Sequence, residues 1–151
     1  MPGRSTKVLD AYQLAACLHT GQTDKAGRPY IEHLTRVMLR VQEAGGDVHQ
    51  QIAALLHDAI EDGKATGKHL QWLGVPAEAL ETMLILSRSK GQPYEDYLDE
   101  VKGDSRALMV KACVLQDNTD PARLAALQET VEQQLRDKYS KAAQLLGIST
   151  M

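Results

Sequence analysis

The stretch that decides the fold is Ile52–Asp62, which reads IAALLHDAIED. Its apolar residues recur at helical spacing and nearly fill the segment, so they predict a helix buried at the centre of the protein. Four ionisable residues interrupt the apolar face within six positions, namely His57, Asp58, Glu61 and Asp62. Burying such groups costs free energy unless they are paired or bind a metal. The stretch therefore predicts a central helix with a chemical site at its carboxyl end.

The spacing of these four residues places them in pairs along the helix. Residues four apart share a helix face, so His57 lies over Glu61 and Asp58 lies over Asp62. An adjacent imidazole and carboxylate can reach one cation, and this mixture of donors suits Mn²⁺, Fe²⁺ or Zn²⁺ better than Ca²⁺. One turn further on, Glu61 and Asp62 could activate a water molecule or transfer its proton. The alternative is a polar helix end with solvated acids, although acids there oppose the helix dipole.

The composition around this stretch predicts an all-α protein with a single domain covering residues 1–151. A chain of 151 residues is long enough for one core and short for two. Hydrophobic residues make up 43% of it, yet aromatic residues make up only 4%. A core rich in Ala and Leu favours packed helices over sheets. Helical spacing and Gly or Pro breaks predict seven or eight helices, near 8–18, 31–41, 52–61, 70–72, 77–86, 94–101, 107–116 and 121–146.

The charge and the chain ends argue against several classes of partner. The net charge is −3 and the pI is about 5.9, so there is no global basic field to hold a nucleic-acid backbone. Residues 1–7 lack the apolar core of a signal peptide, and no apolar stretch is long enough to span a membrane. We therefore expect a cytoplasmic protein without nucleic-acid or membrane partners. Cys17 and Cys113 are predicted to be buried free thiols.

A second histidine, His33, also lies in an apolar helical frame, where a lone histidine is usually a core residue. His33 belongs to one of three segments that together form a recognisable pattern: His19–Gln22 (HTGQ), Lys25–His33 (KAGRPYIEH) and Leu55–Asp62 (LLHDAIED). In this order they resemble the HD-domain hydrolases of the stringent response, the hydrolase half of the RelA/SpoT family and its small stand-alone alarmone hydrolase relatives. The resemblance continues weakly through residues 87–94 and 110–118.

This resemblance implies an HD-type helical fold and a divalent cation, usually Mn²⁺, held by His33, His57 and Asp58. It implies that Glu61 and Asp62 position or deprotonate the attacking water. The implied reaction is hydrolysis of the 3′-diphosphate of guanosine tetra- or pentaphosphate, so the expected partner is a phosphorylated nucleotide.

The same resemblance suggests which residues bind this nucleotide. Lys25 and Arg28, in the loop before His33, would neutralise phosphate charge, although a solvated loop is an equal alternative. Lys111 is a weaker candidate of the same kind, together with Arg88 and Lys90. Asn118 would lie on the nucleotide side of the pocket.

The sequence departs from the family at one position, because Val114 stands where a further metal-binding Asp is expected. Asp117 projects about 60° away from that position and Cys113 about 100° away, so neither replaces the carboxylate unless the helix end is distorted. Three protein ligands can still form a catalytic metal site, but the loss predicts weak metal occupancy and reduced activity.

Two further hypotheses remain open beside the enzyme. One is a catalytically impaired HD domain that binds nucleotides as a sensor or regulator, which Val114 favours. The other is a helical interaction module without pocket chemistry, which leaves the clustered acids and histidines unexplained. The long C-terminal helix could pack internally or serve a dimer, so both a monomer and a homodimer are compatible with the sequence.

Overall fold

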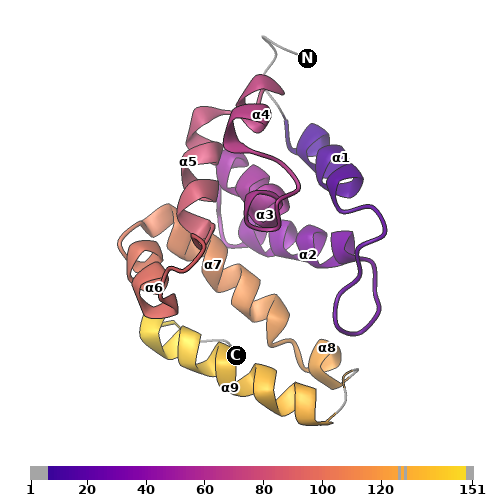
Figure 1. The fold of residues 1–151 in the computed structure, drawn as a ribbon, viewed down its shortest axis with the longest axis vertical. Coiled ribbons are helices and arrows are strands. Elements are labelled where there is room, and N and C mark those ends of the chain that lie inside the picture. Colours follow the sequence, from indigo (N-terminus) through magenta and orange to yellow (C-terminus); the bar gives the residue numbers. More distant parts are fainter. Residues whose placement is uncertain (1–6, 126, 128, 149–151) are drawn as a thin grey trace.

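The computed structural model describes residues 7–125, 127 and 129–148, and this part of the chain is helical without β-strands (Figure 1). The expected all-α fold is confirmed. Nine helices are present in the described part, two of them short: α1 (Val8–Leu18), α2 (Tyr30–Glu43), α3 (Val48–Glu61), α4 (Gly67–Trp72), α5 (Ala77–Leu86), α6 (Tyr94–Lys102), α7 (Ser105–Asn118), α8 (Pro121–Ala125) and α9 (Glu129–Leu146).

Helix α3 is the central element, as its apolar sequence predicts. Every residue from 52 through 57 is buried, and the helix packs against α1, α2, α5 and α7. Figure 1 shows α3 surrounded by α1, α2, α4 and α5 in one half of the molecule. Its start is fixed by Asp47, whose carboxylate accepts a hydrogen bond from the Gln50 backbone at 3.0 Å. The Gln50 side chain accepts one from the Asp47 backbone in return, also at 3.0 Å.

Helix α7 joins this half to the other one, which contains α6, α8 and α9. It packs against α2, α3 and α5 on one side and against α6, α8 and α9 on the other. A hydrophobic cluster around α7 includes Val37 from α2, Val101 from α6 and Leu146 from α9. A separate cluster around α3 includes Leu34 from α2 and Met83 from α5. Because α2 contributes to both clusters, it holds the two halves in a fixed relation.

The C-terminal part differs from the continuous helix predicted over 121–146. Helix α8 ends at Ala125 and α9 begins at Glu129, so that prediction was wrong. The interruption lets α9 run back along α6 and α7 (Figure 1), where it buries Leu135, Ala142 and Leu146.

Both cysteines are free, but only Cys113 is buried. The expectation that Cys17 is buried was wrong, because α1 packs through the faces of Ala11 and Ala15 and leaves Cys17 exposed. Among the described helices, none combines the length and hydrophobicity needed to cross a membrane.

Candidate active site

Three side chains from two helices converge on one point, and they are the three predicted metal ligands. His33 lies on α2, while His57 and Asp58 lie on α3. Each offers one donor atom, and these atoms lie within 4.8 Å of one another. The two imidazole rings are buried with centroids 6.4 Å apart, and the Asp58 side chain keeps 15% of its surface exposed. The convergence creates a candidate metal centre that opens toward solvent on the Asp58 side.

Both histidines direct the same ring nitrogen toward this point. Nδ1 of His57 lies 2.7 Å from the backbone oxygen of Ala54, and Nδ1 of His33 lies 2.6 Å from Oδ2 of Asp117. A carbonyl and a carboxylate can only accept, so Nδ1 is the donor in each ring and Nε2 keeps its lone pair. Burial lowers the pKa of His33 despite the opposing effect of Asp117. The neutral imidazole that results is the form that binds metals.

The third donor, Asp58, is ionised and held in place by a tyrosine. Burial acts to raise the pKa of Asp58. His57 and a hydrogen bond from the Tyr30 hydroxyl to Oδ2 have the opposite effect and outweigh burial, so the pKa of Asp58 is lowered. Burial and the nearby Asp58 raise the pKa of Tyr30, so its hydroxyl remains a donor. Two imidazole nitrogens and one carboxylate oxygen are a donor set that fits a first-row divalent transition metal.

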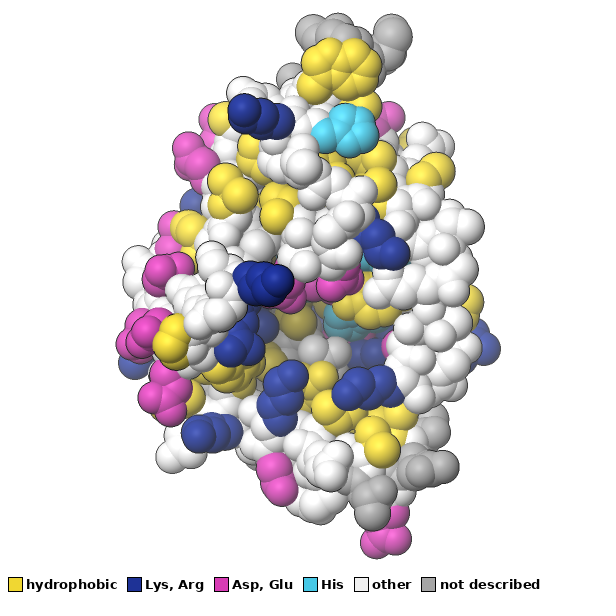
Figure 2. Space-filling model, viewed as in Figure 1, with side chains coloured by type: hydrophobic (Ala, Val, Ile, Leu, Met, Phe, Trp, Pro, Cys, Tyr) yellow, Lys and Arg dark blue, Asp and Glu magenta, His cyan; other side chains and the backbone are white. Residues whose placement is uncertain are grey.

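The metal centre lies in a cavity of about 680 Å³ whose wall is rich in basic side chains. Figure 2 shows Lys and Arg side chains gathered around this hollow, with histidine and acidic side chains visible inside it. The basic residues in the lining are Lys25, Arg88, Lys90, Lys111 and Lys138, against the acidic residues Asp58, Glu61 and Asp62. The chain as a whole is acidic, so this local excess of positive charge favours an anionic ligand.

Lys111 is the most enclosed of these cations. Its Nζ lies over the ring of Tyr97, 5.2 Å from the centroid, and the Tyr97 hydroxyl is itself fixed by a 2.7 Å hydrogen bond to the backbone oxygen of Leu86. Burial lowers the pKa of Lys111, although Asp58 and Glu61 act to raise it. Lys111 therefore places its amino group in the same cavity as the candidate metal centre.

Glu61, at the end of α3, holds a neighbouring loop in place through a hydrogen bond. One of its carboxylate oxygens accepts a hydrogen bond from the backbone N–H of Arg88 at 2.7 Å. Arg88 in turn donates from Nε to the backbone oxygen of Gln92 at 2.8 Å, and its guanidinium lies 5.3 Å from the centroid of the Tyr94 ring. Glu61 thus anchors the loop that carries Lys90, and none of the described residues hydrogen-bonds its second oxygen.

The structure brings together all but one of the predicted site residues. Lys25, Lys111 and Asn118 line the same cavity as the three predicted metal ligands, Glu61 and Asp62. Arg28 is outside this lining. Its side chain is 67% exposed and pairs with Glu32 at 2.8 Å, four residues further along the chain. The geometry therefore favours the solvated-loop interpretation for Arg28 and the site interpretation for Lys25.

Position 114 does face the cavity. Val114 is part of its lining and keeps 6% of its surface exposed, so its methyl groups form wall where a carboxylate was expected. Asp117 does not compensate for this loss, because its Oδ2 contacts the far nitrogen of His33 and its Oδ1 accepts from Arg36. The centre has three protein donors among the described residues.

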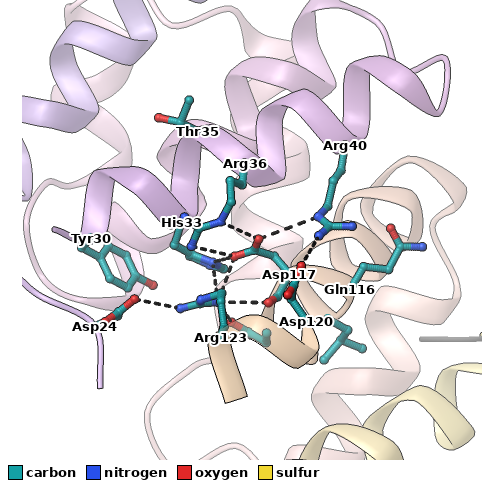
Figure 3. Close-up of polar contacts among 12 residues, drawn as sticks. Asp24, Tyr30, His33, Thr35, Arg36, Arg40, Gln116, Asp117, Asp120 and Arg123 are labelled. Atoms are coloured by element: carbon teal, nitrogen blue, oxygen red, sulfur yellow. Dashed lines mark hydrogen bonds and ion pairs between the residues drawn. The ribbon is translucent and has the colours of Figure 1, made fainter. Parts of the chain in front are cut away.

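Sequence reasoning missed an ionic cluster behind His33. Asp117 is fully buried and is surrounded by Arg36, Arg40 and Arg123, as Figure 3 shows. Burial acts to raise the pKa of Asp117, but the His33 and Arg36 contacts lower it to about 2. A carboxylate near a helix end was a weak signal for a partner. Arg36 gave no signal because it lies 81 positions away in the sequence, and Arg123, six positions away, lies beyond the end of α7.

A smaller cavity of about 300 Å³ adjoins the first and shares Lys25, Tyr30, Asn118 and Tyr139 with it. Its other walls include three apolar side chains, those of Leu124, Leu127 and Leu135. The site thus combines a charged compartment with a less polar one, which suits an organic phosphate with a compact nonphosphate part.

Comparison with known proteins agrees with this geometry. A family profile described as "HD domain" matches residues 11–75, which contain all three metal donors. The chain is an HD-domain protein. It is 30% identical over 157 residues to the bifunctional (p)ppGpp synthase/hydrolase SpoT of Escherichia coli, an alignment that covers 94% of this chain and 22% of that protein.

Other relatives point to the same family. The HD-domain protein is 39% identical over 70 residues to the guanosine-3′,5′-bis(diphosphate) 3′-pyrophosphohydrolase of Aquifex aeolicus, covering 46% of this chain and 10% of that one. The chain therefore spans less than a quarter of the length of these curated relatives. A solved structure titled "A metazoan ortholog of SpoT hydrolyzes ppGpp and plays a role in starvation responses" has a TM-score of 0.77 and 21% identity. It covers 97% of this chain and 88% of its own, so the fold is the same.

Proposed function

We propose that this HD-domain protein is a metal-dependent phosphohydrolase that removes pyrophosphate from the 3′ position of guanosine tetra- or pentaphosphate. The observation that carries the proposal is the convergence of His33, His57 and Asp58 inside a cavity lined by five basic side chains. The printed activities of the SpoT and Aquifex aeolicus relatives support the choice of substrate.

The metal ion would be held by His33, His57 and Asp58, and when bound it would lower the pKa of a water molecule and polarise a phosphate oxygen. Manganese is the ion we propose, with zinc or iron as competitors for a site with two imidazoles and one carboxylate. Because Val114 leaves the site one carboxylate short, the affinity for the ion should be low.

The chain's own groups account for the remaining requirements of the reaction. Lys25 and Lys111 would bind the diphosphate, which carries several negative charges into a cavity already rich in cations. Asp62 and the free oxygen of Glu61 would accept the proton of the attacking water. Asn118, which lines both cavities, would contact the nucleoside. Water adds to phosphorus, the bond to the ribose oxygen breaks, and pyrophosphate leaves.

The test is release of pyrophosphate from guanosine tetraphosphate, measured with Mn²⁺ and again after removal of the metal with a chelator. Metal-dependent release is expected. Binding of the nucleotide without turnover would overturn the hydrolase proposal and favour a sensor. Binding of neither metal nor nucleotide would leave only a helical interaction module.

A matched pair of variants localises the phosphate site. Lys25→Gln and Arg28→Gln each remove one positive charge from the same loop, but only Lys25 lines the cavity. We expect Lys25→Gln to raise KM by about tenfold, the effect of losing roughly 1.4 kcal/mol of binding. Arg28→Gln should change KM by less than about twofold, because exposed charges contribute little. Equal effects would contradict the assignment of the cavity.

A further inference from the structure

Asp117 occupies the centre of a buried ionic cluster directly behind a metal donor (Figure 3). Its Oδ2 lies 2.6 Å from Nδ1 of His33 and 2.9 Å from Nη1 of Arg123. Its Oδ1 accepts from Nε of Arg36 at 2.8 Å. The carboxylate is fully excluded from solvent and is separated from His33 by 84 positions in the sequence. Such an arrangement costs free energy, so a buried charge in this place calls for a function.

We propose that Asp117, fixed by Arg36 and Arg123, is a positioning residue that presents Nε2 of His33 to the metal ion. An imidazole ring has two nitrogens, and a neutral ring can bind a metal only through the one without a proton. Asp117 accepts the Nδ1 proton and so keeps it on that side of the ring. The second histidine, His57, is fixed in the same sense by the backbone oxygen of Ala54.

The two arginines make Asp117 suited to this task. Each carboxylate oxygen has its own guanidinium partner, so the carboxylate stays ionised and cannot rotate without losing a contact. Arg123 also reaches Asp24 at 3.2 Å, and this bond ties the loop containing Lys25 to the same cluster. Asp24 shapes that loop by accepting hydrogen bonds from the backbone of Ala26 at 2.9 Å and of Arg28 at 3.0 Å.

Charge balance supports a positioning role over a direct electrostatic one. Asp117 and Asp24 face Arg36 and Arg123, and Asp120 faces Arg40, so this cluster carries no net charge. A carboxylate placed simply to attract a cation would be left without such neutralisation. A carboxylate that orients a ligand keeps its effect, because that effect depends on accepting one proton at one atom.

The matched test compares Asp117→Asn with Asp120→Asn. Both substitutions remove one carboxylate charge near the end of α7, but Asp120 contacts Arg40 and the Ala122 backbone and does not touch His33. An amide at position 117 must turn its NH₂ group toward either His33 or Arg36. In the first case the proton of His33 moves to Nε2, and in the second the Arg36 contact is lost.

The readout is the affinity for Mn²⁺ alone, measured by titration calorimetry on the full chain. We expect Asp117→Asn to weaken Mn²⁺ binding by about 10- to 100-fold, as for other outer-shell carboxylates, and Asp120→Asn to change it by less than about twofold. Excess Mn²⁺ should restore turnover to Asp117→Asn. Equal Mn²⁺ affinities in the two variants would overturn the proposal.

A second measurement needs no variant and stands if Asp117→Asn does not fold. Nitrogen-15 NMR of the wild-type protein without metal reports which imidazole nitrogen carries the proton. We expect the His33 proton on Nδ1 at neutral pH, and a proton on Nε2 would refute the role of Asp117. The inference rests on His33 being a metal ligand as proposed above. If the wild type binds no Mn²⁺, the proposed function fails, whereas normal binding with the wrong tautomer rejects only Asp117.

Discussion

Replacing Val114 by Asp should strengthen metal binding, because it puts a carboxylate on the cavity wall beside the three existing donors. Val114 is only 6% exposed, so an aspartate there is largely withdrawn from water. Without metal, burying this group should cost about 1–3 kcal/mol of folding stability. With metal, a fourth protein ligand should offset part or all of that cost through a gain in affinity of at least tenfold.

These energies translate into a measurable change in Tm. A tenfold gain in affinity adds about 1.4 kcal/mol of stabilisation at saturating metal. For a chain of this size, 1 kcal/mol shifts Tm by about 2–4 °C. Mn²⁺ should therefore raise the Tm of Val114→Asp by about 3–6 °C more than it raises the Tm of the wild type. The assay is thermal denaturation with and without saturating Mn²⁺.

The matched control is Val114→Asn, which has nearly the same shape as the aspartate but no charge. It should lose similar stability without metal and should gain no additional Tm on Mn²⁺ addition beyond the wild-type shift. If Mn²⁺ stabilises the Asp and Asn variants equally, position 114 does not face the ion, and Val114 is not the reason for weak metal binding.

Two other predictions concern acids with assigned contacts. Glu61→Gln keeps an oxygen for the Arg88 backbone N–H but cannot accept the proton of the attacking water. We therefore expect its kcat to fall by about 10²-fold or more with KM unchanged. Glu61→Ala should also raise KM, because it releases the loop. Steady-state kinetics of the two variants separates these effects. The pKa of Asp117 is lowered from 3.8 to about 2, so its stabilising contribution is present above pH 3.8 and is lost as the pH falls toward 2. This contribution is about 2.5 kcal/mol. The free energies of unfolding of wild type and Asp117→Asn, measured in urea, should therefore differ less as the pH falls from 3.8 to 2. A difference that stays constant over this pH range would contradict the assignment.

The parts of the site that could be predicted from the sequence are those set by local spacing. The apolar run of α3 determines a buried helix, and the i to i+4 relation fixes how His57 and Glu61 stack on it. The departure at Val114 was visible only through the resemblance to the family, which implies a metal-binding Asp three residues after Lys111. Even the exposed pairing of Arg28 was encoded locally, since Glu32 lies one helical turn away.

The parts that could not be predicted depend on contacts between distant segments. Asp117 pairs with Arg36 across 81 positions, and Arg123 pairs with Asp24 across 99. A single arginine on a helix has no periodic pattern that identifies a distant partner. The interruption between α8 and α9 has a similar origin, because it depends on the surface that α6 and α7 offer and not on the propensity of residues 121–146.

The charges of the site fall into two groups, and the residue at position 114 affects only the group inside the cavity. Behind His33 the acids and arginines balance, so this group holds geometry without attracting a ligand. Inside the cavity five basic residues face three acidic ones, and this excess attracts a polyanion before any metal binds. A carboxylate at position 114 would halve that excess from two charges to one. The Val114→Asp substitution that strengthens metal binding should therefore also weaken attraction of the diphosphate, so the valine favours the anionic substrate at the expense of the cation.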